Sequence, residues 1–145
     1  MKISDSLAYY FTVIYKVYLD CNRSYIIDDA LDGKLGGSFD FRHHIQDMMI
    51  KSLTKGSVTK YDIDIVWDDT KDTDDLKVKD FIFDLYVYLD NTDVKGYVES
   101  NIYKGESGIV GLPPDWSEAK DDWYDYIIDT DYDIKLDSVS FIDRL

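Results

Sequence analysis

The chain has 145 residues, of which 45% are hydrophobic and 15% aromatic, so it can bury a core and is not expected to be disordered. Its formal net charge of -14 at pH 7 disfavours direct binding to nucleic acid or to anionic lipid. No apolar run approaches the ~20 residues that a membrane-spanning helix needs.

The first 60 residues are predicted to form two helices. Helical spacing of apolar residues predicts the first helix over 4–20, although the many β-branched and aromatic residues there leave a strand as the alternative. Residues 24–31 fit a short helix or a strand. Ser38 or Asp40 is suited to cap a second helix that Gly56 ends. One side of that helix carries Phe41, Ile45, Met48, Met49 and Leu53.

From residue 61 the apolar residues alternate with polar ones, which predicts strands. Residues 61–67 and 77–90 read as half-buried strands joined by a polar connection over 68–75. Residues 94–103 are predicted to return as the second strand of a hairpin, and 105–111 to form a loop.

The last part of the chain is predicted to contain a helix and a closing strand. Pro113 and Pro114 introduce the helix, whose apolar stripe is Trp116, Ala119, Trp123 and Ile127. Alternation from Tyr132 predicts a strand that continues to Phe141. The predicted fold is therefore α+β in one domain, 1–145: two N-terminal helices, an antiparallel meander of about three strands, a third helix and a C-terminal strand.

The charge is distributed unevenly along the chain. Residues 1–60 hold seven acids and eight bases, whereas residues 61–145 hold 23 acids and eight bases. Of the 30 acids, 27 are aspartates, whose short side chains lose little conformational freedom when they are fixed. The sequence thus predicts a nearly neutral helical support, residues 1–60, behind an acidic and β-rich part, residues 61–145.

No metal or cofactor site is predicted. Asp129, Asp131 and Asp133 match the first ligands of a calcium loop, but Ile134 and Ser140 stand where that loop needs glycine and glutamate. His43 and His44 are neighbours, so on a helix they do not share a face, and one is expected to pack while the other is exposed. Cys21 is the only cysteine, which rules out an internal disulfide and fits a reducing cytoplasm.

No catalytic motif is complete either. Residues 105–109, GESGI, lack the last glycine of a nucleophile elbow, and residues 33–37 lack the Gly-Lys-Ser/Thr of a phosphate-binding loop. We therefore expect a protein that is not an enzyme.

The charge predicts an inhibitor that imitates nucleic acid and occludes the basic nucleic-acid-binding site of another protein. Two settings fit: a phage or mobile-element protein acting against a nuclease, restriction enzyme or CRISPR effector in a bacterial cytoplasm, and an immunity protein that neutralises a cognate nuclease toxin. The predicted partner-binding residues are Asp62, Asp64, Asp68, Asp69, Asp72, Asp74, Asp75, Asp121, Asp122, Asp125, Asp129, Asp131, Asp133, Tyr124 and Tyr126.

Imitation of a phosphate backbone requires these acids to share one face. Alternate residues of a strand lie ~6.8 Å apart, which is about two phosphate steps, so a single strand is too sparse. The other interpretations are a non-inhibitory module for a basic protein, and a cryptic enzyme or ligand-binding protein with a pocket at residues 105–114. A homodimer is compatible with the sequence.

Overall fold

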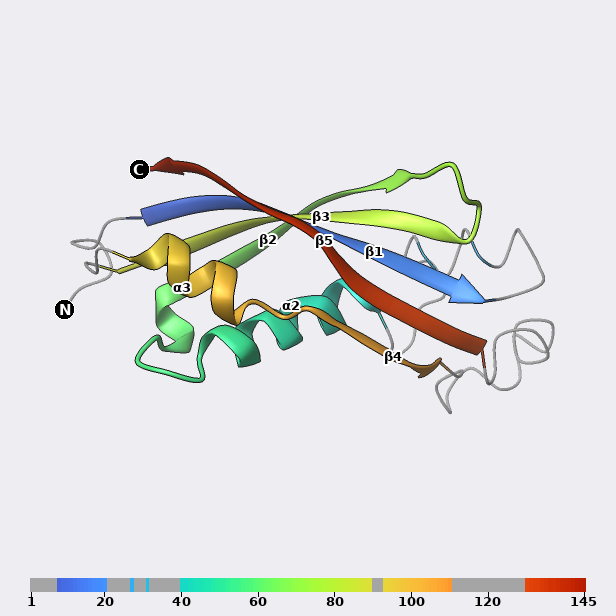
Figure 1. Ribbon diagram of the computed structural model, residues 1–145, viewed down its shortest axis with the longest axis horizontal. Helices are drawn as coiled ribbons and strands as arrows, with labels where there is room; N and C mark the ends of the chain where they lie inside the picture. Colours follow the sequence, from blue (N-terminus) through green and yellow to red (C-terminus); the bar gives the residue numbers. More distant parts are fainter. Residues whose placement is uncertain (1–7, 21–26, 28–30, 32–39, 90–92, 111–129) are drawn as a thin grey trace.

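The computed structural model describes residues 8–20, 27, 31, 40–89, 93–110 and 130–145. They form a five-stranded antiparallel sheet in the order β2-β3-β1-β5-β4. Its strands are β1 (Ala8–Asp20), β2 (Ile63–Asp72), β3 (Val78–Tyr88), β4 (Gly105–Val110) and β5 (Thr130–Arg144). Helices α2 (Phe41–Leu53) and α3 (Val94–Asn101) both lie on one side of this sheet (Figure 1).

The prediction of a helix over 4–20 is wrong, because residues 8–20 form the central strand β1. Every second side chain of this strand is fully buried. These residues are Phe11, Val13, Tyr15, Val17 and Leu19. Their period of two is that of a strand, and β-branched and aromatic side chains pack well on a pleated surface. The apparent helical stripe arose because both faces of this strand are rich in apolar residues.

The prediction of a helix starting near Asp40 is confirmed by α2. Asp40 is the N-cap, and its carboxylate accepts a hydrogen bond of 2.9 Å from the backbone N–H of Arg42. Phe41, Ile45 and Met49 are buried against the sheet, as their spacing indicates. The last helical residue is Leu53 and Thr54 is the C-cap, whose N–H makes a final helical bond to the carbonyl of Ile50, so the helix ends before Gly56.

Replacing Asp40 with alanine is expected to cost about 1 kcal/mol of stability at neutral pH, since the N-cap interaction is lost. Partial burial alone would raise the pKa of Asp40, but hydrogen bonds and an ion pair from Arg42 outweigh it and lower that pKa. A carboxyl group whose pKa is lower in the folded state stabilises that state fully at pH values above its unfolded pKa of about 3.9. This contribution to stability is lost as the pH falls through the folded pKa. Urea unfolding should therefore show a smaller difference in the free energy of unfolding between wild type and the Asp40→Ala variant at pH 3 than at pH 7. An equal difference at both pH values would contradict this assignment.

The prediction of a polar connection over 68–75 is wrong for most of that segment. Strand β2 starts at Ile63, after a short 3-10 turn (Lys60–Asp62), and continues to Asp72. Most of the predicted connection is therefore strand. In β3 the predicted buried side is confirmed, since Phe81, Phe83, Leu85 and Val87 are all buried.

Two further expectations are wrong. Residues 94–103 do not return as a strand: Val94–Asn101 is α3, and Val94, Val98 and Ile102 recur every four residues on its buried side. Residues 105–110 are not a loop but β4, which pairs with β5. The predicted closing strand is confirmed and runs from Thr130 to Arg144. The helix predicted after Pro113 lies outside the described residues.

The predicted order of elements is therefore replaced by a predominantly antiparallel β architecture. The sheet's helix-facing side, its inner face, forms the core with α2, α3, Ile27 and Leu31. Tyr15 lies at its centre and donates a hydrogen bond of 2.5 Å to the carbonyl of Tyr103. In the described part of the chain, no helix has the length and apolar character needed to cross a bilayer.

Candidate protein-binding surface

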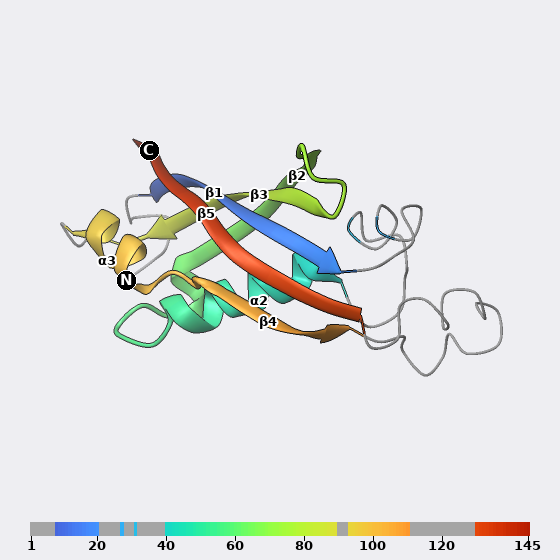
Figure 2. The ribbon, with the colours of Figure 1, turned by 45° about the vertical axis from the view of Figure 1, so that its right-hand side comes forward.

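The side of the sheet opposite the helices, here called the outer face, is rich in aspartate. Alternation along the paired strands places one set of side chains in the core and the other on this face. None of the described helices covers the outer face (Figures 1 and 2). The strands bring to it Asp20, Asp64, Asp69, Asp80, Asp84, Asp131, Asp133 and Asp143, and Asp137, which the register skips, lies close enough to Lys16 on this face to interact with its charge.

A row of lysines crosses the middle of the outer face. Lys71 of β2 and Lys16 of β1 lie on either side of Asp80, and Lys135 of β5 follows in register. The Lys16 ammonium lies 2.8 Å from the Asp80 carboxylate, and this hydrogen bond raises the pKa of Lys16. This row, in which three lysines face one aspartate, divides most acids of the outer face into two groups.

One group gathers where β1 ends and β5 begins. Asp20 is the register partner of Asp131, and Asp133 lies two residues along β5. The turn between β2 and β3, with Asp74 and Asp75, lies at the same end, because the Leu19 N–H donates to the carbonyl of Lys77. We call Asp20, Asp74, Asp75, Asp131 and Asp133 the acidic end. Lys77 compensates part of this charge, since its ammonium lies 3.2 Å from Asp20.

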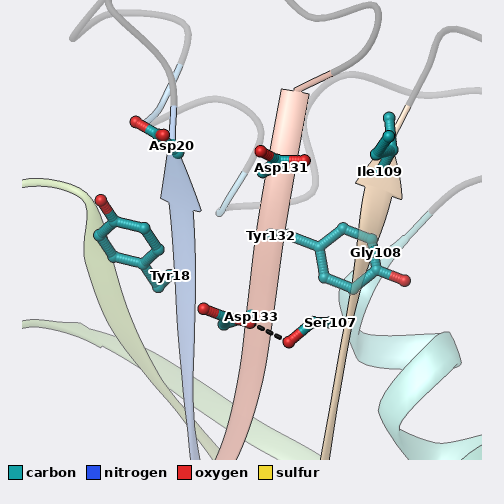
Figure 3. Close-up of a pocket in the computed structure, with 8 residues that line it drawn as sticks. All are labelled: Tyr18, Asp20, Ser107, Gly108, Ile109, Asp131, Tyr132 and Asp133. Atoms are coloured by element: carbon teal, nitrogen blue, oxygen red, sulfur yellow. Dashed lines mark hydrogen bonds between the residues drawn. The ribbon is translucent and has the colours of Figure 1, made fainter.

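The acidic end is hollowed by a groove of about 460 Å³ between β1, β5 and β4 (Figure 3). Asp20, Asp131 and Asp133 line it together with Tyr18 and the exposed Ile109. Ser107 of β4 donates a hydrogen bond to Asp133, which fixes that carboxylate at the groove. The groove therefore offers carboxylates beside aromatic and aliphatic surface, a combination that suits the long side chains of arginine or lysine.

The other group lies at the far end of the outer face and includes Asp64, Asp84 and Asp143. Tyr10 and Tyr86 stack here with ring centroids 4.9 Å apart. The Tyr10 hydroxyl donates 2.8 Å to Asp84, and this hydrogen bond raises the pKa of Tyr10. Tyr10 and Asp20 are ten residues apart in β1, so the two groups are separated by about 33 Å along the strands.

Comparison with known proteins adds no relative. No protein-family model, curated protein or solved structure matches this chain.

The predicted partner-binding residues fall into several places. Asp131, Asp133, Asp74 and Asp75 share the acidic end, whereas Asp64 lies in the far group and Asp69 between the two. Asp62 accepts hydrogen bonds from Thr59 in the 3-10 turn, Asp68 is the extra residue of a bulge, and Asp72 pairs with Lys79 on the inner side. Six lie outside the described residues: Asp121, Asp122, Tyr124, Asp125, Tyr126 and Asp129.

Several aspartates of the outer face are absent from the predicted partner-binding set, among them Asp20, Asp80 and Asp84. Asp20 stands where the predicted first helix ends, yet it is central to the acidic end. Asp80 and Asp84 lie on the outer side of β3. Once β1 is recognised as a strand, the alternation from Tyr10 to Asp20 assigns these positions to the same face. The error in β1 therefore concealed part of the surface.

A second polar cluster lies between α2 and β4 on the inner side. His44 Nε2 contacts a Glu106 carboxylate oxygen, and the Tyr103 hydroxyl lies 3.5 Å from the same oxygen. His43 is largely exposed, so the prediction of one packed and one exposed histidine is confirmed. Burial raises the pKa of Tyr132, whose ring lies nearly perpendicular to the His44 ring, with centroids 6.3 Å apart. No group of three metal-ligating side chains occurs among the described residues, and the His44–Glu106 contact serves to hold α2 against β4.

Proposed function

We propose that this chain is a binding protein that engages a basic surface of a nucleic-acid-binding enzyme and blocks that surface. The observation that supports this most is the acidic end, where Asp20, Asp131 and Asp133 surround one groove. A partner that normally holds phosphate groups presents arginine and lysine, which these carboxylates complement. A nuclease, either a defence enzyme or a toxin, is the partner class that we favour.

The division of the outer face refines this proposal. The lysine row of Lys16, Lys71 and Lys135 interrupts the carboxylates, so the outer face as a whole is a poor imitation of a continuous phosphate chain. We therefore place the binding energy at the acidic end. The segment that joins Val110 to Thr130 adds six acids to the sequence next to this end. The overall charge of -14 adds steering of a cationic partner over a longer distance.

A pair of variants with equal net charge tests the proposal. The first is Asp20→Asn/Asp131→Asn/Asp133→Asn, which keeps side-chain size and leaves an acceptor for Ser107. The control is Asp47→Asn/Asp64→Asn/Glu99→Gln, whose residues lie on α2, the far end of β2 and α3. Each chain is immobilised and exposed to bacterial lysate at low salt, and captured proteins are challenged with excess duplex DNA.

We expect wild type and control to capture a nucleic-acid-binding protein that duplex DNA displaces. The acidic-end variant should bind that protein about tenfold more weakly or worse, and the interaction should be lost near 1 M salt, where the Debye length is about 3 Å. Equal capture by both variants would show that the acidic end is not the site. A partner that DNA does not displace would contradict blocking of a nucleic-acid site.

A further inference from the structure

In the described part of the chain, the second half of β5 forms an open edge of the sheet. Strand β4 pairs with β5 only from Thr130 to Lys135, after which the Leu136 N–H donates 2.8 Å to the carbonyl of Lys104. Both ribbon views show β4 leaving β5 toward α3 (Figures 1 and 2). Among the described residues, the remainder of β5 up to Arg144 pairs with β1 alone. Its other side therefore presents backbone donors and acceptors.

This edge also exposes apolar side chains. Phe141, Ile142 and Leu145 are 38%, 50% and 61% exposed. The pairing with β1 skips Asp137 and Ile142, so these two residues are bulges. Between them, Ser138–Phe141 is a regular stretch that pairs with Ile14 to Phe11. Such a stretch is long enough for a short peptide strand, while the bulges work against extended pairing.

The remaining edges are better protected. The free side of β2 carries Asp64, Asp69 and Lys71 and is interrupted by a bulge at Asp68. Charges and bulges of this kind are how edge strands avoid pairing with other chains. Strand β4 contains two glycines, Gly105 and Gly108, which weaken a strand, and the charged Glu106. In contrast, Ser138–Phe141 carries no charge, which singles out β5 as the edge that can accept a strand.

We propose that this edge of β5 binds an extended segment of a cationic partner, which adds a strand to the sheet. The added strand would place alternate side chains on each face. On the outer face its neighbours are the flanking acids Asp137 and Asp143, which suit lysine or arginine. On the inner face its neighbours are Val139 and Phe141, and because the Lys95 ammonium lies 6.0 Å from the centre of the Phe141 ring, this side suits apolar residues and disfavours a further cation. The recognised segment therefore alternates basic and apolar residues.

Charge decides the occupant. A second copy of the chain would bring another -14 and would set acidic faces side by side, whereas a basic segment is attracted. The proposal shares with the proposed function only the cationic character of the partner. The two surfaces are separate, because the acidic end lies at the Thr130 end of β5 and the open edge at its Arg144 end.

The test uses a synthetic heptapeptide that alternates lysine and valine, capped at both ends, and a version whose central valine is proline. Binding is measured by fluorescence anisotropy, and the site is located by amide hydrogen exchange. The variants are Ile142→Lys, at the open edge, and Ile109→Lys, at the groove of the acidic end. Both residues are exposed, and both substitutions change the net charge equally.

We expect the peptide to slow amide exchange within residues 138–141 and to bind the Ile142→Lys variant at least about tenfold more weakly than wild type, while Ile109→Lys changes binding less than about twofold. The proline version, which cannot complete the ladder, should bind at least about tenfold more weakly. Protection that maps to Asp20, Asp131 and Asp133, with Ile109→Lys the more damaging variant, would overturn the edge proposal and leave the proposed function standing. Equal losses in both variants would show binding by overall charge alone and would also overturn it, as would absence of binding to wild type or protection between two copies of the chain.

Discussion

Replacement of Gly105 by alanine is expected to lower the free energy of unfolding by about 3 kcal/mol or more. Gly105 opens β4 with φ of +153°, a conformation that side-chain-bearing residues rarely adopt. A Cβ atom at this position would lie 2.2 Å from the backbone carbonyl oxygen of Ile134. Because the obstacle is backbone in β5, relief requires the two strands to separate. Urea denaturation followed by circular dichroism measures the loss.

Gly56→Ala is the matched control. Its added Cβ would meet the end of the Tyr97 side chain, whose hydroxyl oxygen would lie 3.3 Å away, and no backbone atom within 4 Å is among its three nearest neighbours. We expect the unfolding free energy of this variant to lie within about 1 kcal/mol of wild type, since a glycine-to-alanine change is tolerated where the backbone allows it. If Gly105→Ala were as stable as Gly56→Ala, the described junction between β4 and β5 would be wrong.

Replacement of Tyr15 by alanine is expected to cost about 4 kcal/mol, because a large, fully buried ring is removed from the centre of the core. The ring packs edge-on against Phe83 at 6.4 Å and lies 5.9 Å from the ring of Tyr103. These neighbours come from β3 and from the segment before β4. The substitution therefore loosens the contact of the central strand both with β3 and with the segment before β4.

Tyr15→Phe separates packing from hydrogen bonding. The ring is kept, but the carbonyl of Tyr103 loses its hydroxyl donor, so the expected cost is about 1–2 kcal/mol. Denaturant unfolding with an unchanged m-value would report both variants as changes in stability rather than in compactness. Similar costs for the two substitutions would show that the cavity left by the ring collapses, contrary to the expectation for this core.

The parts of the fold that were predictable are those with one apolar face. Helix α2 carries Ile45 and Met49 at helical spacing after a good N-cap. In β3, Phe81, Phe83 and Leu85 share one face, while Asp80 and Asp84 mark the other. Strand β1 was not predictable from periodicity, because Tyr10, Ile14 and Tyr18 on its outer face are apolar too. The prediction of a strand over 94–103 was wrong for a different reason. The segment is short, and the spacing of Val94 and Val98 fits both a helix and a strand, so packing in the folded chain decides between them.

The candidate surface was predictable in kind but not in layout. The sequence indicated an acidic surface in the second half of the chain, and Asp131 and Asp133 do lie together on β5. It did not indicate that Asp20 would join them, because that requires knowing that β1 pairs with β5 in antiparallel register. Nor did it reveal the lysine row, whose members are far apart in sequence and become neighbours only across strands.

The strand order also sets a requirement on the timing of folding. Among the strands that the structure describes, the central one comes first in the sequence, and one of its two neighbours, β5, comes last. During synthesis, β1 leaves the ribosome long before residues 130–144 exist. The hairpin of β2 and β3 can therefore form early, at a time when β1, with Phe11 and Tyr15, still lacks its neighbour β5. Contacts this distant in sequence make folding slow. The interval leaves a growing chain with one apolar strand exposed, and its high negative charge then keeps neighbouring nascent chains apart.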